Sequence, residues 1–372
     1  MTSETFTYRS TIEAPADRVF RYHEYDGAFE RLVPPWENVR VVEKQGGIED
    51  GSFVVLRVSV GGIEIESRHV HSDYRPGRQF RDTQETGPFR SFSHLHRVEP
   101  RGDARAELID EISYELPAGL FGRAVGAAAM RERLARMFRY RHETTRNDVL
   151  AHHANGESSR KTILISGAGG LIGQALIPFW RTGGHRVIRL VRRATKGVDE
   201  RQWDPASGTL DAAVLEGVDA VVHLAGDPIA DGRWSAEKKA RMLKSRVEGT
   251  RALAEAIATI ESPPECWLSA SAVGIYGARG DEELDETSEP GSGFLADVCR
   301  QWEESTQPAL ERSVRVVTPR IGVVLSPAGG ALAKMLPAFR AGVGGRIGSG
   351  DQVMSWIALD DLVYAFDHAL FD

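Results

Sequence analysis

The chain has 372 residues, of which 41% are hydrophobic and 27% charged, and its formal net charge is −7. This length predicts two or three domains, and the acidic balance gives no reason to expect a nucleic acid as partner. No apolar run approaches the roughly 18 to 20 residues of a membrane span. The N-terminus lacks the features of a secretory signal, and the only two cysteines, Cys266 and Cys299, fit a reducing compartment, so we expect a cytoplasmic protein.

Residues 1–150 alternate hydrophobic and polar side chains with a period of two, which is typical of antiparallel strands. A strand at 6–12 and a short helix at 14–22 come first. A helix near 120–150 comes last, with Leu134 and Phe138 at helical spacing. Between them lie six strand-like runs, at 39–44, 52–60, 62–74, 78–85, 90–99 and 104–115. This order predicts an α+β domain in which a curved sheet wraps a long helix and encloses a cavity.

The opening Ile12-Glu-Ala-Pro-Ala-Asp-Arg-Val-Phe20 resembles the start of the helix-grip superfamily of START-like and polyketide-cyclase-like domains (SRPBCC). The resemblance covers residues 1–150. It implies a ligand-binding domain whose cavity takes a hydrophobic or amphipathic molecule, and it does not identify that molecule.

Histidines recur at period-two spacing in the N-terminal domain. His69 and His71 share one strand face, and His94 and His96 share another, while Asp110 lies on a third strand. If these faces line the cavity, the side chains form a polar ligand site or a metal site. Alternatively, the histidines point outward or are satisfied separately. We favour this second interpretation and predict no metal site, because spacing alone does not place strands side by side.

A polar stretch at 151–160 predicts a linker, and the pattern changes after it. Strands and helices alternate from residue 161 to 372, which predicts a doubly wound parallel sheet of the Rossmann type.

A glycine-rich turn follows the first strand of this second domain. Strand 162–166 leads into Gly167, Gly170 and Gly173, and a second strand follows at 185–191. In such a turn the first glycine permits the tight bend, the second lets the backbone approach a pyrophosphate, and the third lets helix and strand pack closely. Phosphates then lie at the N-terminus of a helix, where free N–H groups favour negative charge. The turn predicts a dinucleotide site.

The end of the second strand discriminates between NAD and NADP. An acidic residue there would bind the ribose 2′-hydroxyl, but this chain has Arg192 and Arg193. A guanidinium suits a 2′-phosphate, so NADP(H) is favoured over NAD(H). The alternative is that Arg192 only solvates the strand end.

Two further apolar runs, 218–226 and 265–271, read as buried strands that end in small residues, which would let a cofactor lie close to the backbone. The predicted cofactor contacts are Gly167, Gly170, Leu171, Ile172, Gly173, Arg192, Arg193, Leu224, Ala225, Gly226, Ser269, Ala270 and Arg320.

These motifs, with Ser245-Arg-Val-Glu-Gly-Thr250 and Gly293-Phe-Leu-Ala-Asp-Val-Cys299, resemble an extended short-chain dehydrogenase/reductase of the NAD-dependent epimerase/dehydratase group. The likeness is greatest to its epimerase-family, cell-division-inhibitor-like subgroup. The resemblance spans 161–372 and implies an oxidoreductase or epimerase acting on a small polar substrate. It also allows a homodimer.

Two departures from that family concern catalysis and length. The family uses Ser with a Tyr-x-x-x-Lys pair, but Phe294 and Val298 stand at the tyrosine and lysine positions. Ser271 is retained, and Tyr276 is the substitute acid considered, so these two are the candidate catalytic residues. The chain also stops at Asp372, where family members continue into a substrate-binding lobe, so we expect that lobe to be missing or the chain to be a fragment.

Three functions therefore stay open. The first is an NADP(H)-dependent oxidoreductase or epimerase. The second is a catalytically degenerate dinucleotide-binding sensor or ligand carrier. The third, a cyclase activity in the N-terminal domain, rests on fold analogy alone.

Overall fold

The computed structural model describes residues 3–60, 62–116, 120–156, 160–346 and 348–372. The chain divides into two compact units. The N-terminal unit comprises 1–159 and 181–184, and the C-terminal unit comprises 160–180 and 185–372.

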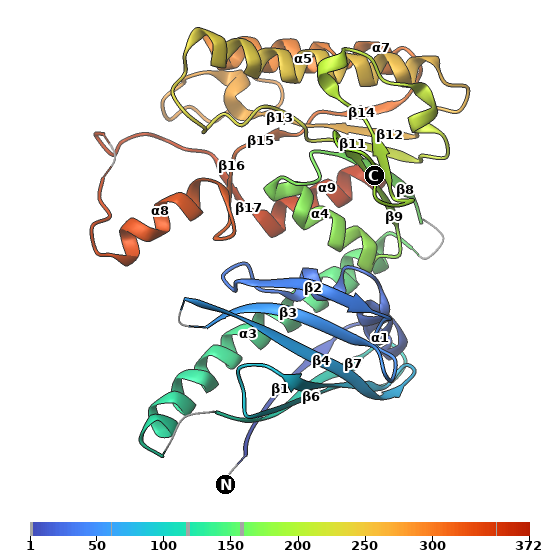
Figure 1. Ribbon diagram of the computed structural model, residues 1–372. Coiled ribbons are helices and arrows are strands. Elements are labelled where there is room, and N and C mark those ends of the chain that lie inside the picture. The colour runs from blue at the N-terminus through green and yellow to red at the C-terminus, as the bar shows by residue number, and fades with distance from the viewer. Residues whose placement is uncertain (1–2, 61, 117–119, 157–159, 347) are drawn as a thin grey trace. The chain divides into compact units, whose positions relative to one another are not determined.

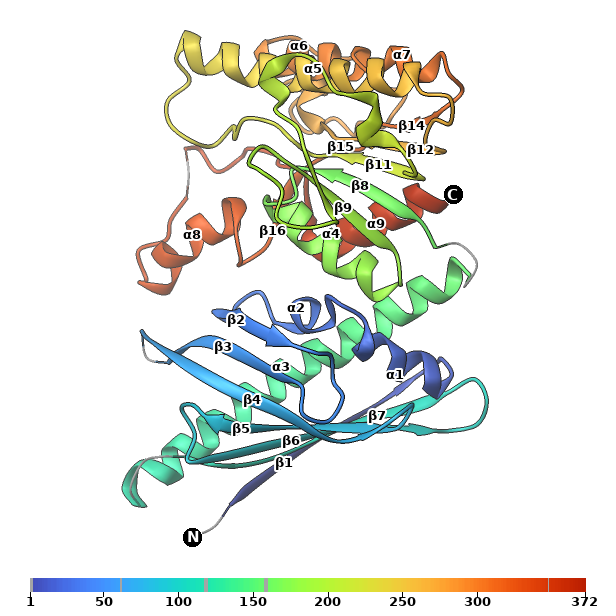
Figure 2. The ribbon, with the colours of Figure 1, turned by 45° about the vertical axis from the view of Figure 1, so that its right-hand side comes forward.

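The N-terminal unit is built on one antiparallel sheet in the order β1-β7-β6-β5-β4-β3-β2. The strands are β1 (Glu4–Ile12), β2 (Val39–Gln45), β3 (Phe53–Val60), β4 (Ile63–Arg75), β5 (Gln79–Thr86), β6 (Ser91–Pro100) and β7 (Ala106–Glu115). Helices α1 (Ala16–Glu24) and α2 (Ala28–Leu32) connect β1 to β2, and the long α3 (Leu120–Ala154) runs along the sheet (Figures 1 and 2). The arrangement confirms the predicted helix-grip fold.

Alternation within the strands places one face of this sheet in the core. Ile12, Phe20 and Leu108 form one buried cluster, and Ile112 packs with Phe138 of α3 in another. Two details differ from the sequence prediction. The five-residue α2 was not predicted, and α3 extends to Ala154, so the first four residues of the predicted linker are helical. Residues 157–159 of that linker lie outside the described residues.

The C-terminal unit is built on a parallel sheet in the order β10-β9-β8-β11-β12-β14. Its strands are β8 (Thr162–Ser166), β9 (Arg186–Val191), β10 (Glu200–Gln202), β11 (Ala220–His223), β12 (Cys266–Ser269) and β14 (Arg315–Val317). Two small parallel pairs join β13 (Ser271–Ala272) to β15 (Arg320–Ile321), and β16 (Val323–Leu325) to β17 (Trp356–Ala358). The strand order is that of a doubly wound dinucleotide-binding sheet and confirms the predicted Rossmann class.

Helices cover both faces of this sheet (Figure 1). On one face lie α5 (Ala236–Thr259) and α7 (Gln307–Leu310), and on the other lie α4 (Leu171–Thr182) and α9 (Leu359–Phe371). The remaining helices are α6 (Phe294–Glu304), α8 (Gly330–Arg340) and the short 3-10 helices η1 (Pro205–Ser207), η2 (Ala212–Leu215) and η3 (Val273–Tyr276). Leu164, Val221 and Trp267 from the strands pack with Leu253 and Ile257 of α5 in one fully buried cluster.

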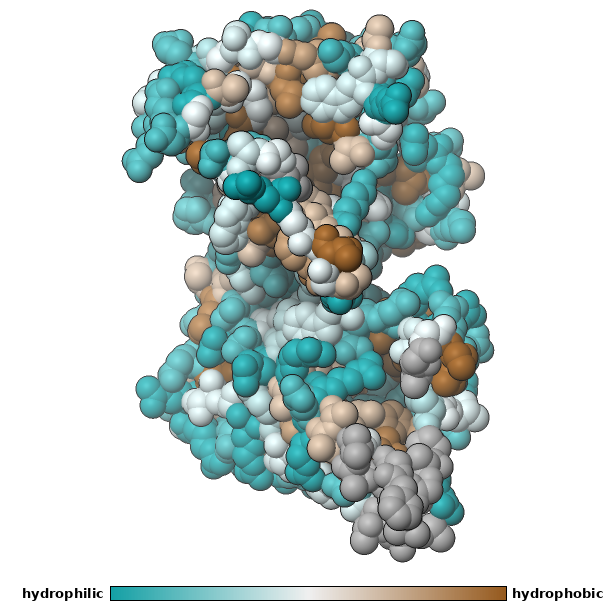
Figure 3. All heavy atoms as spheres, turned by 90° about the vertical axis from the view of Figure 1, so that its left-hand side faces the viewer, coloured by the Kyte–Doolittle hydropathy of each residue, from teal (hydrophilic) through white to brown (hydrophobic). Residues whose placement is uncertain are grey.

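Large hydrophobic side chains remain exposed in the segment from α8 to β17. Phe339, Val343 and Trp356 are each more than half exposed, and Figure 3 views the face on which α8 lies, where hydrophobic and hydrophilic surface are mixed. Among the described residues, no helix combines the length and apolar character needed to cross a membrane.

Candidate functional site

The carboxyl ends of β8, β11 and β12 lie next to one another. Ser166 is paired in register with His223, and His223 with Ser269. The Ser166 hydroxyl accepts hydrogen bonds from the backbone N–H of Leu224 and Ala225, at 3.2 and 3.4 Å, and therefore donates to His223 Nδ1 at 2.7 Å. These contacts fix the two loops that leave β8 and β11. The sheet order reverses between these two strands, which is where doubly wound sheets bind their ligands.

Glycine is required at two positions of the β8–α4 turn. Gly167 has φ +72°, and a Cβ there would lie 2.8 Å from the carbonyl carbon of Leu224. A Cβ on Gly173 would lie 2.6 Å from the Gly167 carbonyl oxygen. The Gly170 amide donates to that same oxygen at 2.9 Å. The turn is thus closed on itself and pressed against the next loop, as expected of a backbone that cradles a pyrophosphate at the start of α4.

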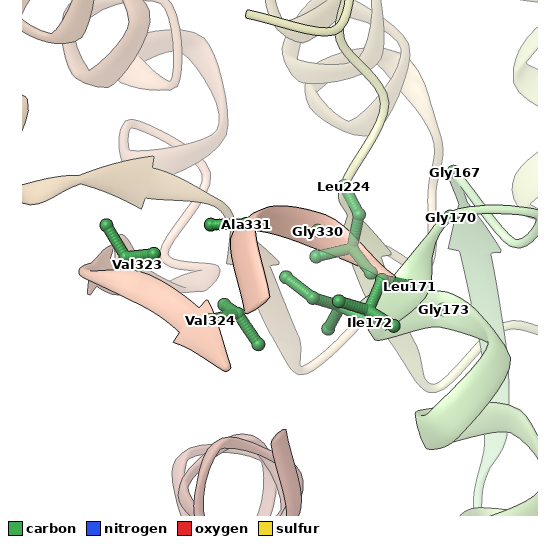
Figure 4. Close-up of a pocket in the computed structure, with 10 residues that line it drawn as sticks. All are labelled: Gly167, Gly170, Leu171, Ile172, Gly173, Leu224, Val323, Val324, Gly330 and Ala331. Atoms are coloured by element: carbon green, nitrogen blue, oxygen red, sulfur yellow. The ribbon is translucent and has the colours of Figure 1, made fainter. Parts of the chain in front are cut away.

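A pocket of about 310 Å³ opens beside this turn. Six predicted cofactor residues line it: Gly167, Gly170, Leu171, Ile172, Gly173 and Leu224. The opposite wall consists of Val323, Val324, Gly330 and Ala331 (Figure 4). Sequence reasoning missed this wall, and the pair Gly329-Gly330 after an apolar run is the one local signal that could have indicated it. A glycine cradle, a helix N-terminus and an apolar wall together fit a dinucleotide.

The turn after β11 carries the predicted residues Ala225 and Gly226. A Cβ on Gly226 would lie 3.1 Å from the guanidinium carbon of Arg246, so a basic side chain packs against the turn. At the end of β12, the Ala270 amide donates to the His223 carbonyl at 3.0 Å, and the buried Ser269 hydroxyl has no hydrogen-bond partner among the described residues. The predicted residues of both loops therefore lie at the same edge of the sheet as the glycine turn.

The two arginines after β9 differ in their surroundings. Arg193 donates to both carboxylate oxygens of Glu200, at 2.7 and 2.6 Å, and this contact is the main reason why the pKa of Glu200 is lowered to about 2. Arg192 is exposed, and its guanidinium has no hydrogen bond or ion pair within the described part of the chain. Of the two, Arg192 is the one available to an anion.

The two candidate catalytic residues belong to one hydrogen-bonded network. Ser271 donates to Glu303 at 2.5 Å. Arg320 binds both oxygens of Glu303, each at 3.0 Å, and also donates to the Tyr276 hydroxyl at 2.9 Å. Tyr276 in turn donates to the Asp285 carbonyl at 2.7 Å. Arg320, predicted to contact the cofactor, is thus held by protein groups, and Glu303 is a member of the network that sequence reasoning did not assign.

The positions of the missing tyrosine and lysine lie on α6. Phe294 begins this helix and packs edge-on against Trp234, with ring centroids 5.9 Å apart, while Val298 is buried. Neither side chain has a proton to transfer. The two positions at which the family's tyrosine and lysine are expected therefore carry packing side chains.

The N-terminal unit brings most of the predicted histidines together. His69, His94 and His96 converge on Asp82, and His94 and His96 also contact Asp110. The expectation that these histidines point outward or are satisfied separately is therefore wrong for these three. His71 pairs in register with Asp82, but its buried Nδ1 has no hydrogen-bond partner among the described residues.

Sequence reasoning missed two members of this cluster. Asp82 lies on β5 and shares a strand face with the buried Phe80. His142 follows the buried Phe138 by one helical turn of α3, and its Nε2 lies 2.6 Å from Asp110. Asp82 follows Phe80 by two residues on a strand, and His142 follows Phe138 by four residues on a helix. These intervals could have placed both side chains on the buried face.

Comparisons with known families agree with both halves of this description. A model of the NAD dependent epimerase/dehydratase family matches residues 163–372, and a model described as polyketide cyclase / dehydrase and lipid transport matches residues 3–146. The two resemblances inferred from the sequence are thereby confirmed. The glycine turn and the first match together assign nucleotide-cofactor binding to the C-terminal unit.

Individual relatives are similar mainly in the C-terminal unit. The Epimerase family protein Mb2239 of Mycobacterium bovis is 46% identical over 208 residues, which is 56% of this chain and 68% of that protein. The human Epimerase family protein SDR39U1 is 36% identical over 56% of this chain and 70% of its own length. A crystal structure of a nucleoside-diphosphate sugar epimerase from Corynebacterium glutamicum is 33% identical, covers 99% of this chain and 76% of that one, and has a TM-score of 0.84.

Proposed function

The chain belongs to the NAD dependent epimerase/dehydratase family, and from this premise we propose that it is an NADP(H)-binding oxidoreductase or epimerase of a small polar substrate. The observation that carries the proposal is the closed glycine turn, in which Gly167 and Gly173 leave no room for a side chain beside the pocket. Bound NADP(H) would supply a nicotinamide for hydride transfer. Gly167, Gly170 and the first turn of α4 would hold its pyrophosphate, and Leu171, Ile172 and Leu224 would form the apolar wall.

The preference for NADP(H) rests on Arg192. Arg192 offers an exposed guanidinium at the carboxyl end of β9, without a partner among the residues that the structure describes, and this suits the 2′-phosphate, while Arg193 is engaged by Glu200. We expect NADPH to bind more tightly than NADH. Arg192→Ala should weaken NADPH binding while leaving NADH binding unchanged, because only NADPH carries the phosphate.

Titration calorimetry on the full chain with both nucleotides tests this preference. Arg186→Ala is the matched control, since Arg186 begins the same strand at its other end and pairs with Asp199. Equal affinity for the two nucleotides, or a loss of NADPH affinity that is as large in Arg186→Ala as in Arg192→Ala, would refute the role of Arg192.

For the chemical step we propose Ser271 as the residue that contacts the substrate. Its hydroxyl proton is directed at the Glu303 carboxylate, which Arg320 holds in place, so the Ser271 oxygen keeps lone pairs with which to accept a hydrogen bond. Tyr276 would act as a positioning residue, since its hydroxyl fixes Arg320. Ser271→Ala should then lower kcat without lowering the affinity for NADPH.

A second function is supported by Phe294 and Val298, which place no proton-transferring side chain at the two positions of α6 where the family's tyrosine and lysine are expected. In this case the C-terminal unit binds the dinucleotide as a sensor, and the N-terminal unit carries a hydrophobic or amphipathic ligand. The buried aromatic rings of Phe80 and Phe138 beside the histidine–aspartate cluster would suit a ligand with one apolar and one polar end.

NADPH oxidation against a panel of carbonyl substrates separates the two functions. Turnover with any member of the panel, abolished in Ser271→Ala, supports the enzyme. Tight NADPH binding with no turnover across the panel favours the sensor.

A further inference from the structure

The cluster in the N-terminal unit is a layered arrangement of histidines around two carboxylates. Asp82 of β5, His94 and His96 of β6, and Asp110 of β7 come from three neighbouring strands, with Asp82 opposite His94 and His96 opposite Asp110 in the strand registers. The side chains of His94 and Asp110 are 4% and 5% exposed, and those of His96 and Asp82 are 14% and 16% exposed. Four ionisable groups are thus gathered where water has little access.

The distances within the cluster fall into two classes. Asp110 Oδ1 lies 2.7 Å from His94 Nε2 and 2.8 Å from His96 Nδ1, which are lengths of hydrogen bonds to a charged acceptor. The opposite ring nitrogens, His94 Nδ1 and His96 Nε2, lie 3.2 and 3.4 Å from Asp82 Oδ2. In the neutral form that a metal ligand requires, an imidazole has one N–H, so a ring that donates to Asp110 turns a lone pair toward Asp82.

The longer distances match the spacing of ligands around a metal ion. Bonds of about 2.1 Å from nitrogen or oxygen to a divalent ion place neighbouring ligand atoms about 3.0 to 3.4 Å apart in octahedral or tetrahedral geometry. One ligand atom from each of Asp82, His94 and His96 lies within 4.8 Å of the other two. Two imidazoles and one carboxylate are a donor set typical of divalent first-row transition metals.

A second layer of contacts orients these three groups. His69 Nδ1 lies 3.0 Å from the other oxygen of Asp82, and His142 Nε2 lies 2.6 Å from the second oxygen of Asp110. The ring of His96 is stacked on Phe80 at 4.2 Å with an interplanar angle of 9°. Ligating histidines in metalloproteins usually donate their second N–H to a carboxylate, and Asp110 Oδ1 is placed to accept from both His94 and His96.

We propose that Asp82, His94 and His96 bind a divalent first-row transition-metal ion and that Asp110 positions both imidazoles. Three protein ligands leave at least one coordination position for water or for the ligand of this unit. The competing explanation is an ion-pair network in which the two imidazoles bridge Asp82 and Asp110 without an ion. A metal titration separates the two explanations.

The test is a Co²⁺ titration of the full chain after treatment with a chelator. Co²⁺ bound to nitrogen and oxygen ligands has visible absorption bands, so the spectrum reports both the stoichiometry and the coordination. We expect saturation at one equivalent, displacement of Co²⁺ by Zn²⁺, and loss of the bands in Asp82→Asn and His96→Gln. Asp110→Asn should keep the bands but bind roughly 10- to 100-fold more weakly, since it removes only an orienting contact.

His153→Gln is the matched control, because His153 is an exposed histidine of the same unit, and it should bind Co²⁺ like the wild type. Circular dichroism monitors the fold of each variant. A folded wild-type chain that shows no saturable binding overturns the proposal whatever the variants do, and so does wild-type binding by a folded Asp82→Asn. Complete loss of the bands in Asp110→Asn would overturn the assignment of Asp110 to the second layer.

Discussion

The glycine turn allows the sharpest test of how the C-terminal unit is built. We consider Gly167→Ala, in which the new Cβ would lie 2.8 Å from the Leu224 carbonyl carbon on a backbone with φ +72°. The left-handed conformation costs an L-residue about 1–2 kcal/mol, and overpacking against backbone costs about 1–3 kcal/mol. The two effects sum to roughly 2–5 kcal/mol, a large part of the ~5–15 kcal/mol that stabilises a typical domain.

Gly169→Ala is the control within the same turn. A Cβ at this position would meet no heavy atom within 4 Å, and the Gly169 backbone is not left-handed. Alanine there reduces the freedom of the unfolded chain, so we expect unchanged stability or a gain of about 0.4–1 kcal/mol.

Urea unfolding followed by tryptophan fluorescence measures the difference in the absence of nucleotide. Of the seven tryptophans only Trp36 precedes residue 160, so the signal reports almost entirely on the C-terminal unit. Gly167→Ala should shift the transition midpoint to lower urea while Gly169→Ala does not. Equal midpoints for the two variants would refute the steric argument and, with it, the closed geometry on which the cofactor site depends.

Three further predictions concern buried or paired ionisable groups. Burial lowers the pKa of His223 from 6.5 to about 4. The free energy of unfolding is therefore highest above pH 6.5 with respect to this group, and it falls by up to about 3 kcal/mol as the pH falls toward 4. His223→Gln should flatten this part of a pH–stability curve measured by urea unfolding. Arg31→Met should destabilise the N-terminal unit by about 3–5 kcal/mol in thermal unfolding. Arg31 and Asp148 form a buried ion pair at 2.9 Å, and the carboxylate would lose that partner. A loss under about 1 kcal/mol would contradict this prediction. The pKa of Glu200 is lowered to about 2, with Arg193 as the main cause, so this stabilisation is fully present above about pH 4.5 and is lost as the pH falls through 2. The difference in unfolding midpoint between Arg193→Ala and wild type should therefore be largest at about pH 7 and shrink as the pH falls below about 4.5.

Local patterns in the sequence were sufficient to predict the strands of the N-terminal sheet and the first strands of the C-terminal one. The bounds predicted for the first strand of the second domain, 162–166, are those observed for β8, because a continuous apolar run between a polar linker and a glycine turn has few other interpretations. Alternation of period two located all seven strands of the N-terminal sheet, because one face of each strand is directed at the core and the other is not. The fold class therefore followed from short-range information.

Contacts between distant segments were beyond such reasoning. Val323 and Gly330 reach the glycine turn from more than 150 positions along the chain, and no spacing rule connects them. In the histidine cluster the relevant faces were recognised, but strand spacing does not state which strands are neighbours. Only the sheet order, which places β5 beside β6 and β6 beside β7, brings Asp82 and Asp110 to opposite sides of the same two histidines.

Binding and proton transfer have different requirements, and the C-terminal unit meets them unequally. Holding a pyrophosphate needs backbone amides and the absence of side chains, which the turn at Gly167 and Gly173 supplies. Proton transfer needs a group whose proton is free to move to the substrate. The Tyr276 hydroxyl already donates to the Asp285 carbonyl and accepts from Arg320, so protonating a substrate would require breaking the first bond. The Ser271 hydroxyl also donates, to Glu303, but its oxygen keeps lone pairs that can accept a hydrogen bond from a substrate. For this reason Ser271, rather than Tyr276, is where the substrate contact of this site should be sought.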